Sequence, residues 1–337
     1  MTTTADLRAM VEALPGGDRL RREALPTAPK AMLATLTHER FSRDGWLFER
    51  KLDGVRCLAI CDSASVRLSS RTGQRLTNTY PELVDALTGH GEGGLVVDGE
   101  VVAFEHGHTS FHRLQGRMQI TDPDAARRTG IAVFYYVFDI LHAGGYDVRS
   151  LPLRARKRLL RQVVPFGDPL RFTVHRNRDG EAAFEQACRW GWEGVIAKRD
   201  DSRYVPTRSP DWLKFRCDSQ QEFVICGFTP PKGSRIAFGA LLLGYYDGPA
   251  LRYAGMVGTG FDTATLRDLH ARLQSLEQDR PAVTGKGLPR RAHWVKPALV
   301  AQVGFTEWTS DGKLRHPRYL GLRTDKRPRD VVREDPD

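Results

Sequence analysis

The most constraining feature of this chain is a change near Gln221 in the spacing of its apolar, Gly and Pro residues. This change divides the chain into two parts of different fold class. From Trp46 to Arg216, short apolar stretches alternate with segments of helical periodicity, and this pattern predicts a mixed α+β domain. The helical segments are 81–87, 153–164 and 181–190. After Gln221, strands follow closely between Gly and Pro residues at 222–228, 240–246, 251–257 and 294–309, with one helix at 263–276.

These segments predict four regions along the chain. We expect an N-terminal polar, helical appendage over 1–30, an α+β domain over 31–220, a β-barrel of the OB-fold type over 221–326, and a basic, partly ordered tail over 327–337. A chain of 337 residues is long enough to bury two separate cores. A five-stranded barrel is the economical fold for about a hundred residues with this strand spacing.

Composition limits the partners of this chain. The 51 Lys and Arg residues exceed the 41 Asp and Glu residues, so the formal charge is +10 and the sequence favours a polyanionic partner. Charge alone does not separate DNA from RNA or acidic lipid. The sequence contains neither a secretory leader nor an apolar run of the roughly 18 residues that span a bilayer, so we expect an intracellular protein without a membrane partner.

The cysteines give a further expectation about the compartment. The five cysteines form no C-x-x-C pair and no even framework in a small secreted chain, which predicts reduced thiols in a cytosolic protein. They stand at positions 57, 61, 188, 217 and 226.

The main chemical candidate is Lys51, in the segment Trp46-Leu-Phe-Glu-Arg-Lys51-Leu-Asp53-Gly54. The alternation before the glycine predicts a strand that ends in a turn, with Glu49 and Lys51 on the same side. A lysine attacks phosphorus only as the neutral amine, which nearby cations and partial burial favour. The pattern K-x-D-G is short, and an exposed lysine beside a turn remains the alternative when this tetrapeptide is read alone.

Further polar residues follow Lys51 in a fixed order. Arg71 lies in Ser70-Arg71-Thr72-Gly73, and Asp98-Gly99-Glu100 follows an apolar strand over 95–97. Phe138 lies in a predicted strand over 133–141, and Glu193-Gly-Val-Ile-Ala-Lys198 and Trp212-Leu-Lys214-Phe-Arg216 come later. In the last segment, the two-residue period of a strand places Lys214 and Arg216 on one face, where they could bind phosphate together. The alternative is an edge strand on which both cations are solvated.

This series resembles the covalent nucleotidyltransferases, the superfamily of ATP-dependent polynucleotide ligases and mRNA capping enzymes, over residues 30–328. The resemblance implies that Lys51 is the nucleophile that carries AMP, with Lys214 and Arg216 as catalytic cations. It implies ATP as co-substrate and Mg²⁺ or Mn²⁺ as the metal, bound by Glu193, with Asp53 a second candidate because carboxylate oxygens suit these ions. The predicted nucleotide-binding residues are Glu49, Arg56, Glu100, Phe138, Lys198, Asp325 and Lys326, and Arg71 is expected to receive the 5′-phosphate of a nick.

The nucleotide-binding residues have different expected tasks. Glu49 is the candidate acceptor for the adenine amine, Glu100 is expected to meet the ribose, and Phe138 is expected to stack on the base. Arg56 and Arg71 suit phosphate because the planar guanidinium forms two hydrogen bonds. Two residues depart from the family pattern: Arg216 stands where lysine is usual, and Leu52 stands where an aromatic residue is frequent.

Three further segments narrow the resemblance to the ligase domain of bacterial non-homologous end-joining ligases. They are Phe111-His-Arg-Leu-Gln-Gly-Arg-Met118, Phe138-Asp-Ile-Leu141, and the stretch from Arg315 to Lys326. This resemblance implies nicked or broken duplex DNA as substrate, and the end-binding protein Ku with separate polymerase and end-processing proteins as partners. It also implies a cytoplasmic, nucleoid-associated location.

The sequence therefore predicts an ATP-dependent DNA ligase that works through lysyl-AMP and DNA-adenylate in repair and end joining. An RNA ligase or a capping-type enzyme that uses GTP is the alternative within the same chemistry. A DNA-end-binding scaffold without catalysis is the alternative from another class.

Overall fold

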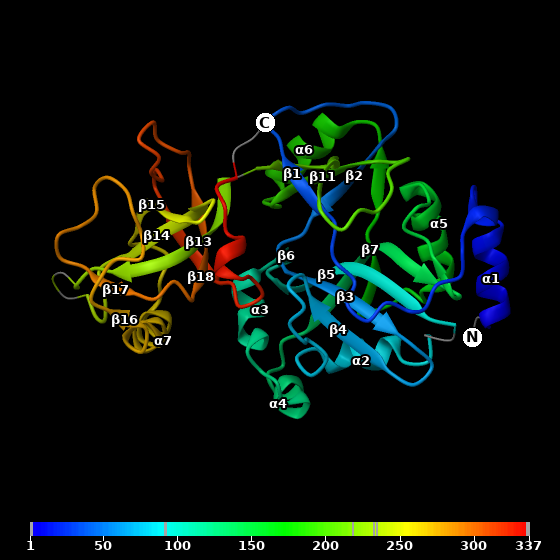
Figure 1. The fold of residues 1–337 in the computed structure, drawn as a ribbon, viewed down its shortest axis with the longest axis horizontal. Coiled ribbons are helices and arrows are strands. Elements are labelled where there is room, and N and C mark those ends of the chain that lie inside the picture. The colour runs from blue at the N-terminus through cyan, green and yellow to red at the C-terminus, as the bar shows by residue number, and fades with distance from the viewer. Residues whose placement is uncertain (1–2, 91–92, 218, 232, 234, 335–337) are drawn as a thin grey trace. The chain divides into compact units, whose positions relative to one another are not determined.

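In a computed structural model, which describes residues 3–90, 93–217, 219–231, 233 and 235–334, the chain divides into two compact units. Among the described residues, those up to 217 form the first unit and those from 219 to 334 form the second. Each unit has its own sheets and its own buried core, and each is described here by itself (Figure 1).

The larger sheet of the first unit has seven strands. Its main order is β4-β3-β5-β7-β8, with β6 paired to β5 and β9 paired to β7. The strand bounds are β3 Val55–Cys61, β4 Val66–Ser70, β5 Leu95–Glu105, β6 His108–Thr109, β7 Val133–Ala143, β8 Tyr146–Asp147 and β9 Leu170–Phe172. The expectation that Asp98 to Glu100 follow a short strand is wrong, because β5 runs through them and pairs with β3 and β7 on its two sides.

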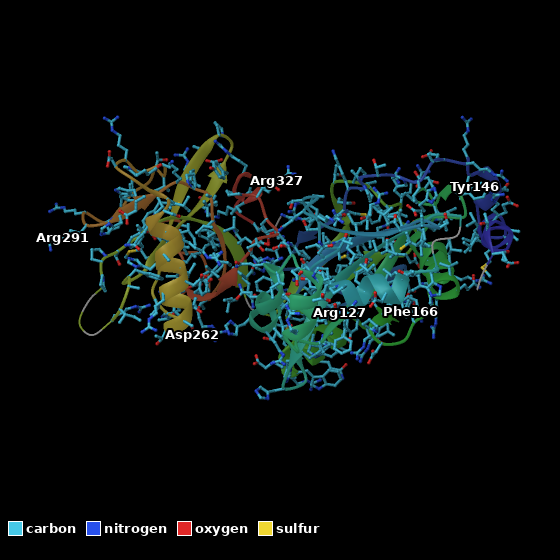
Figure 2. The ribbon with its side chains drawn as sticks, turned by 90° about the horizontal axis from the view of Figure 1, so that it is seen from below. Arg127, Tyr146, Phe166, Asp262, Arg291 and Arg327 are labelled. Carbon is cyan, nitrogen blue, oxygen red and sulfur yellow. A yellow bond between two sulfur atoms is a disulfide. The ribbon has the colours of Figure 1, made fainter. Side chains whose placement is uncertain are left out.

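Four of the helices of the first unit contact this sheet: α1 Thr4–Glu12, α2 Pro81–Leu87, α3 Phe111–Met118 and α5 Leu153–Val163. The helix α4, Pro123–Arg128, packs against α2, and a 3-10 turn η1 lies at Gly17–Arg19. The expected appendage over 1–30 contributes to the core, because Leu7 and Val11 of α1 are buried in it. The side chain of Tyr146 reaches α1, where its hydroxyl donates to Glu12 at 2.5 Å (Figure 2).

The smaller sheet of the first unit carries the Lys51 segment. Its order is β1-β12-β11-β2-β10, with bounds β1 Leu33–Leu36, β2 Trp46–Lys51, β10 His175–Asn177, β11 Gly194–Arg199 and β12 Arg208–Arg216. One face packs against α6, Gly180–Arg189, through Phe48, Ala197 and Phe215. The other face meets the larger sheet in a core that includes Leu58 and Trp212, so the two sheets face each other.

The second unit is built from strands and one long helix. Its bounds are β13 Ser219–Phe228, β14 Leu241–Asp247, β15 Ala250–Val257, α7 Thr263–Gln274, β16 Glu277–Gln278, β17 His293–Val295, β18 Val300–Phe305, β19 Arg318–Leu322 and the 3-10 turn η2 Pro328–Asp330. The strand order is β15-β14-β13-β17-β16, and β18 joins β13 to β19.

Two expectations about the second unit need correction. The strand expected over 294–309 is divided into β17 and β18, and Pro297 lies between them, where its missing N–H cannot serve a sheet ladder. The described part of the tail expected over 327–337 is ordered: it contains η2, and Val331 is buried. Within the described residues, no helix combines the length and apolarity needed to cross a bilayer.

The expectation of reduced thiols is wrong for two of the five cysteines. Cys188, near the end of α6, forms a disulfide with Cys217, and 29 positions separate them in the chain. The sequence spacing did not reveal the pair because only the packing of α6 beside β12 brings the sulfur atoms together. Cys57, Cys61 and Cys226 are free and buried, and burial raises the pKa of Cys61 to about 12.

Candidate active site

The strand register of the smaller sheet arranges the predicted site residues in rows across β2, β11 and β12. Lys51, Gly194 and Arg216 lie opposite one another in one row. Glu49 and Lys214 belong to the next such row, with Ile196 between them. Because side chains alternate along a strand, both rows project to the same face. The predicted common side of Glu49 and Lys51, and of Lys214 and Arg216, is therefore confirmed.

Gly194 leaves the middle of the first row without a side chain. Its φ is +143°, and a Cβ at this position would lie 1.9 Å from the carbonyl oxygen of Phe215. Any other residue would push β11 away from β12. Because neighbouring strands are about 4.8 Å apart, the backbones of Lys51 and Arg216 are roughly 10 Å apart, and Gly194 places no side chain between these two residues.

Lys51 and Glu193 form an ion pair at the end of these rows. The amine of Lys51 donates to Oε1 of Glu193, and the two side chains are 15% and 7% exposed. The backbone carbonyl of Glu193 also accepts from the N–H of Cys217 at 3.1 Å, which anchors the Glu193 segment to the residue that follows β12. The candidate nucleophile is thus partly buried, in contact with the carboxylate that the sequence assigns to metal binding.

Among the described residues, no group of three or more His, Cys, Asp and Glu side chains is placed to hold a metal ion, so Glu193 and Asp53 are considered as separate candidates. Glu193 lies beside Lys51, and Asp53 is half-buried in the turn that follows β2. Mg²⁺ is commonly held by one or two carboxylates together with substrate phosphate oxygens. The turn itself depends on Gly54, where a Cβ would lie 2.1 Å from the carbonyl oxygen of Val101.

Glu49 is buried between two lysines. Its carboxylate lies 2.5 Å from the amine of Lys157 through Oε1 and 2.6 Å from that of Lys198 through Oε2. Burial favours the neutral acid, but the two ammonium groups outweigh it and hold the pKa of Glu49 below its ordinary value. For Lys198, burial is the dominant influence and lowers its pKa to about 8 in spite of Glu49.

Phe138 lies in the core between the two sheets. The guanidinium of Arg56 is 4.7 Å from its ring centroid, and the amine of Lys198 is 4.2 Å from it. Arg56 is itself held by a bidentate ion pair with Asp98, at 2.5 Å for each contact. Stacking of a base on Phe138 would therefore require at least one of these cations to move.

Arg71 and Glu100 lie near Arg56 on the larger sheet. Arg56 is directly opposite Glu100 in the β3–β5 register, and Arg71 follows the last residue of β4, which pairs with Cys57. Arg71 makes no side-chain hydrogen bond or ion pair with any residue in the described part of the chain. Its guanidinium is available for a substrate phosphate.

The remaining predicted residues, Asp325 and Lys326, belong to the second unit. Asp325 is buried in a bidentate ion pair with Arg323, at 2.8 and 2.9 Å, and Lys326 lies 2.8 Å from Glu222. Burial favours the neutral acid, yet Arg323 and Lys326 hold the pKa of Asp325 below its ordinary value.

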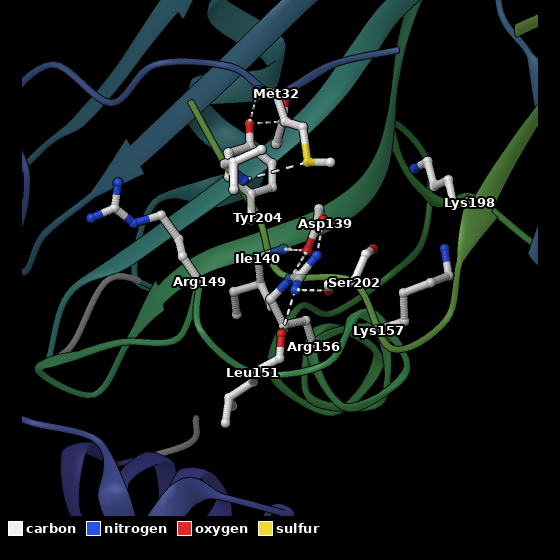
Figure 3. A network of polar contacts seen from close by, with 12 residues as sticks. Met32, Asp139, Ile140, Arg149, Leu151, Arg156, Lys157, Lys198, Ser202 and Tyr204 are labelled. Carbon is white, nitrogen blue, oxygen red and sulfur yellow. Dashed lines mark hydrogen bonds and ion pairs between the residues drawn. The ribbon is translucent and has the colours of Figure 1, made fainter. Parts of the chain in front are cut away.

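Sequence reasoning missed the buried cations of α5. Arg156 forms a buried bidentate ion pair with Asp139 (Figure 3). The amine of Lys157 donates to Glu49. A signal for both was present, because they lie three and four residues after Leu153, on the apolar face of the helix that also contains Leu160. Cations at such positions are buried only when they have partners.

Comparisons with known proteins match both parts of this chain to ATP-dependent DNA ligases. The family model "ATP dependent DNA ligase domain" matches residues 30–216, and "ATP dependent DNA ligase C terminal region" matches 234–326. The multifunctional non-homologous end joining protein LigD of Pseudomonas aeruginosa is 38% identical over 314 residues, which are 90% of this chain and 36% of that protein. A DNA ligase of Natronomonas pharaonis is 31% identical over 317 residues, covering 90% of this chain and 56% of the relative.

A solved structure of a DNA ligase is also similar to this chain. The mycobacterial DNA ligase D complexed with ATP and MES matches with a TM-score of 0.63 and 36% identity, covering 91% of this chain and 98% of that one. The predicted fold class, a nucleotidyltransferase domain followed by an OB-fold-type domain, is confirmed. The chain spans little more than a third of the LigD proteins it matches. Since the first family model alone covers more than half of the sequence, the chain belongs to the ATP-dependent DNA ligase family.

Proposed function

We propose that this ligase seals nicks between a 5′-phosphate and a 3′-hydroxyl in duplex DNA, with AMP carried on Lys51. The observation that supports this most directly is the row of Lys51, Gly194 and Arg216, with Lys214 on the same face and Glu193 in contact with the lysine. A nucleophile, phosphate-binding cations and a carboxylate therefore belong to one face of one sheet.

The reaction proceeds in three displacements at phosphorus. The Lys51 amine gives up a proton to solvent and forms a bond to the α-phosphorus of ATP, while the bond from that phosphorus to the pyrophosphate leaving group breaks. The AMP then passes to the 5′-phosphate of the nick, which frees Lys51. The 3′-hydroxyl finally attacks that phosphate and releases AMP. Lys214 and Arg216 can offset the phosphate charge in each step, because positioning and electrostatics dominate phosphoryl transfer.

Other residues have supporting tasks in this proposal. Glu193 and Asp53 would hold Mg²⁺ or Mn²⁺, which would neutralise phosphate charge. Arg56, Glu100, Phe138 and Lys198 would bind the nucleotide, and Arg71 would receive the nick 5′-phosphate. Asp325 and Lys326 would act from the second unit on the pyrophosphate, so that unit must approach ATP and later make room for DNA.

A role in end joining follows from the relatives named for that process. In this proposal the chain acts on broken or nicked DNA in the bacterial cytoplasm, at the nucleoid. Ku and separate polymerase and end-processing proteins would supply the end-binding and end-preparing steps.

The experiment is label transfer from α-labelled ATP or GTP, read on a denaturing gel, with wild type and Lys51→Ala. Label from ATP on the wild type alone, followed by sealing of a nicked duplex, is the expected result. Label from GTP only would indicate a capping-type enzyme, and preferential sealing of nicked RNA would indicate an RNA ligase. Binding of nicked DNA with no label and no sealing would indicate a scaffold. Each of these three outcomes contradicts the proposal.

A further inference from the structure

The disulfide between Cys188 and Cys217 lies next to the proposed catalytic residues in the chain. Cys217 directly follows Arg216, and its backbone N–H donates to the carbonyl of Glu193 at 3.1 Å. Cys188 lies near the end of α6, in the segment that leads from this helix to Glu193. The disulfide and this hydrogen bond therefore close a ring of the chain that contains residues 188–193.

Two glycines give the backbone around Glu193 freedom to move. Gly191 lies before it and Gly194 directly after it, and their φ angles are +65° and +143°. Glycine adopts such angles at little cost, and it also reaches more alternative conformations than any other residue. The ion pair between Glu193 and Lys51 therefore depends on contacts that hold this segment in place.

A second contact connects the same segment to β2. The guanidinium of Arg50 lies 4.3 Å from the ring centroid of Trp192, on the side of the sheet that faces α6. Arg50 directly precedes Lys51 in β2. Trp192 directly precedes Glu193, which pairs with that lysine. Because neighbouring side chains of a strand point to opposite faces, the two contacts join the segment to both faces of the sheet.

We propose that the disulfide is a positioning element for the attack of Lys51 on ATP, and that its reduction slows the formation of lysyl-AMP. It acts through Glu193 and Arg216, which are linked to its two ends. The inference rests on the proposed function, because it concerns that attack.

Reduction removes the only covalent part of this ring other than the chain itself. A dithiol breaks the S–S bond by supplying two electrons and two protons, leaves two thiols on the protein, and becomes a cyclic disulfide. The link between α6 and the end of β12 is then lost, and the Glu193 segment is held by noncovalent contacts alone.

A reductant acts selectively on this bond. Cys188 and Cys217 are half-buried, so a small dithiol can approach them. The other three cysteines, Cys57, Cys61 and Cys226, are free and buried. Burial raises the pKa of each of these thiols, which keeps them out of thiol–disulfide exchange. An effect of dithiothreitol can therefore be assigned to one bond.

The test measures single-turnover formation of lysyl-AMP from α-labelled ATP with oxidised and dithiothreitol-reduced wild type. The rate constant should fall by about 10-fold or more on reduction, because a misplacement of about 1 Å in an active site can cost roughly 10²-fold. The final labelled fraction should stay the same, since the reduced molecules remain folded. Cys188→Ser should be slow both with and without dithiothreitol, and a rate equal to that of oxidised wild type would overturn the inference.

The variant Leu83→Ala separates positioning from stability. Leu83 is fully buried in the core beside the larger sheet, so this change destabilises the same unit without touching residues 188–193. A loss of stability alone lowers the labelled fraction and leaves the rate constant of the folded molecules unchanged. That pattern is expected for Leu83→Ala. The same pattern in reduced wild type, or no change on reduction, would overturn the inference.

Hydrogen exchange gives a measurement that does not depend on catalysis. Reduction should speed the exchange of the Cys217 amide, which donates to Glu193, more than that of the amides of β5 in the other sheet. An equal change in both would show a general loss of stability and contradict positioning. If oxidised wild type forms no lysyl-AMP, the proposed function fails, and hydrogen exchange still decides whether the disulfide holds the Glu193 segment.

Discussion

Lys51 at the end of β2 and Glu193 just before β11 are ion-paired although 142 positions separate them in the chain. Antiparallel pairing of β2 with β11 places Lys51 opposite Gly194, and this register brings the preceding residue beside the lysine. The proposed nucleophile is therefore held by the residue that directly precedes β11, the candidate metal-binding carboxylate.

Replacing Glu193 by Gln should slow lysyl-AMP formation by about 10²-fold or more, because the carboxylate charge beside Lys51 and the candidate metal ligand are lost together. The measurement is single-turnover adenylation across a range of Mg²⁺ concentrations. Glu181→Gln, at an exposed residue of α6, is the matched control. A rate within threefold of wild type at every Mg²⁺ concentration would contradict this role of Glu193.

Replacing Arg71 by Ala should separate the steps of the reaction. Because Arg71 has no side-chain partner in the described part of the chain, lysyl-AMP formation and stability should change little. Transfer of AMP to the nick should fall by about 10²-fold, since a guanidinium gives phosphate two charged hydrogen bonds. Rapid-quench assays with nicked DNA distinguish the steps. An equal loss in both steps would contradict a contact restricted to DNA.

Reduction of the Cys188–Cys217 disulfide should destabilise the first unit. A loop closed over 29 positions restricts the unfolded chain by about 3–4 kcal/mol in the chain-entropy account. Urea unfolding with and without dithiothreitol measures this difference in the free energy of unfolding. The double variant Cys188→Ser and Cys217→Ser should behave like the reduced protein and show no response to dithiothreitol. If dithiothreitol does not change the free energy of unfolding of wild type either, the disulfide is absent in solution.

The pKa of Glu49 predicts an acid-dependent loss of stability. Its pKa is lower in the folded protein than in the unfolded chain, so its contribution is complete above the ordinary value of 4.5 and is lost as pH falls through the folded-state pKa. Urea unfolding between pH 3 and 7, wild type against Glu49→Gln, should give a stability difference that shrinks toward low pH. Glu39→Gln, at an exposed surface pair, should show a small and nearly constant difference.

The pKa of Lys198 predicts a further rise in stability with pH, in the alkaline range. The folded protein releases this proton near pH 8, whereas the unfolded chain keeps it to about the ordinary value of 10.5. Between these values the unfolded state binds more protons, so this group makes the free energy of unfolding rise with pH. The measurement is the free energy of unfolding as a function of pH, and subtracting the values for Lys198→Met from those for wild type isolates the contribution of Lys198. A flat difference across pH 8 to 10.5 would contradict it.

The sequence by itself determined the features that depend on local periodicity. The division near Gln221, the strand that ends at Lys51, and the common face of Lys214 and Arg216 all follow from spacings of two or of three to four residues. The ordered motifs also sufficed to identify the family. Such features can be read from neighbouring residues because each strand or helix fixes the directions of its own side chains.

Only the tertiary structure decided which distant groups meet. Lys157 lies on the apolar face of α5, but its partner Glu49 is 108 positions away in the chain, and only the packing of α5 against β7 brings the two side chains together. The Lys51–Glu193 pair and the Cys188–Cys217 bond likewise depend on strand register and helix packing. The reason is physical: burial and pairing are set by the elements that cover a side chain, and its own neighbours in sequence do not specify them.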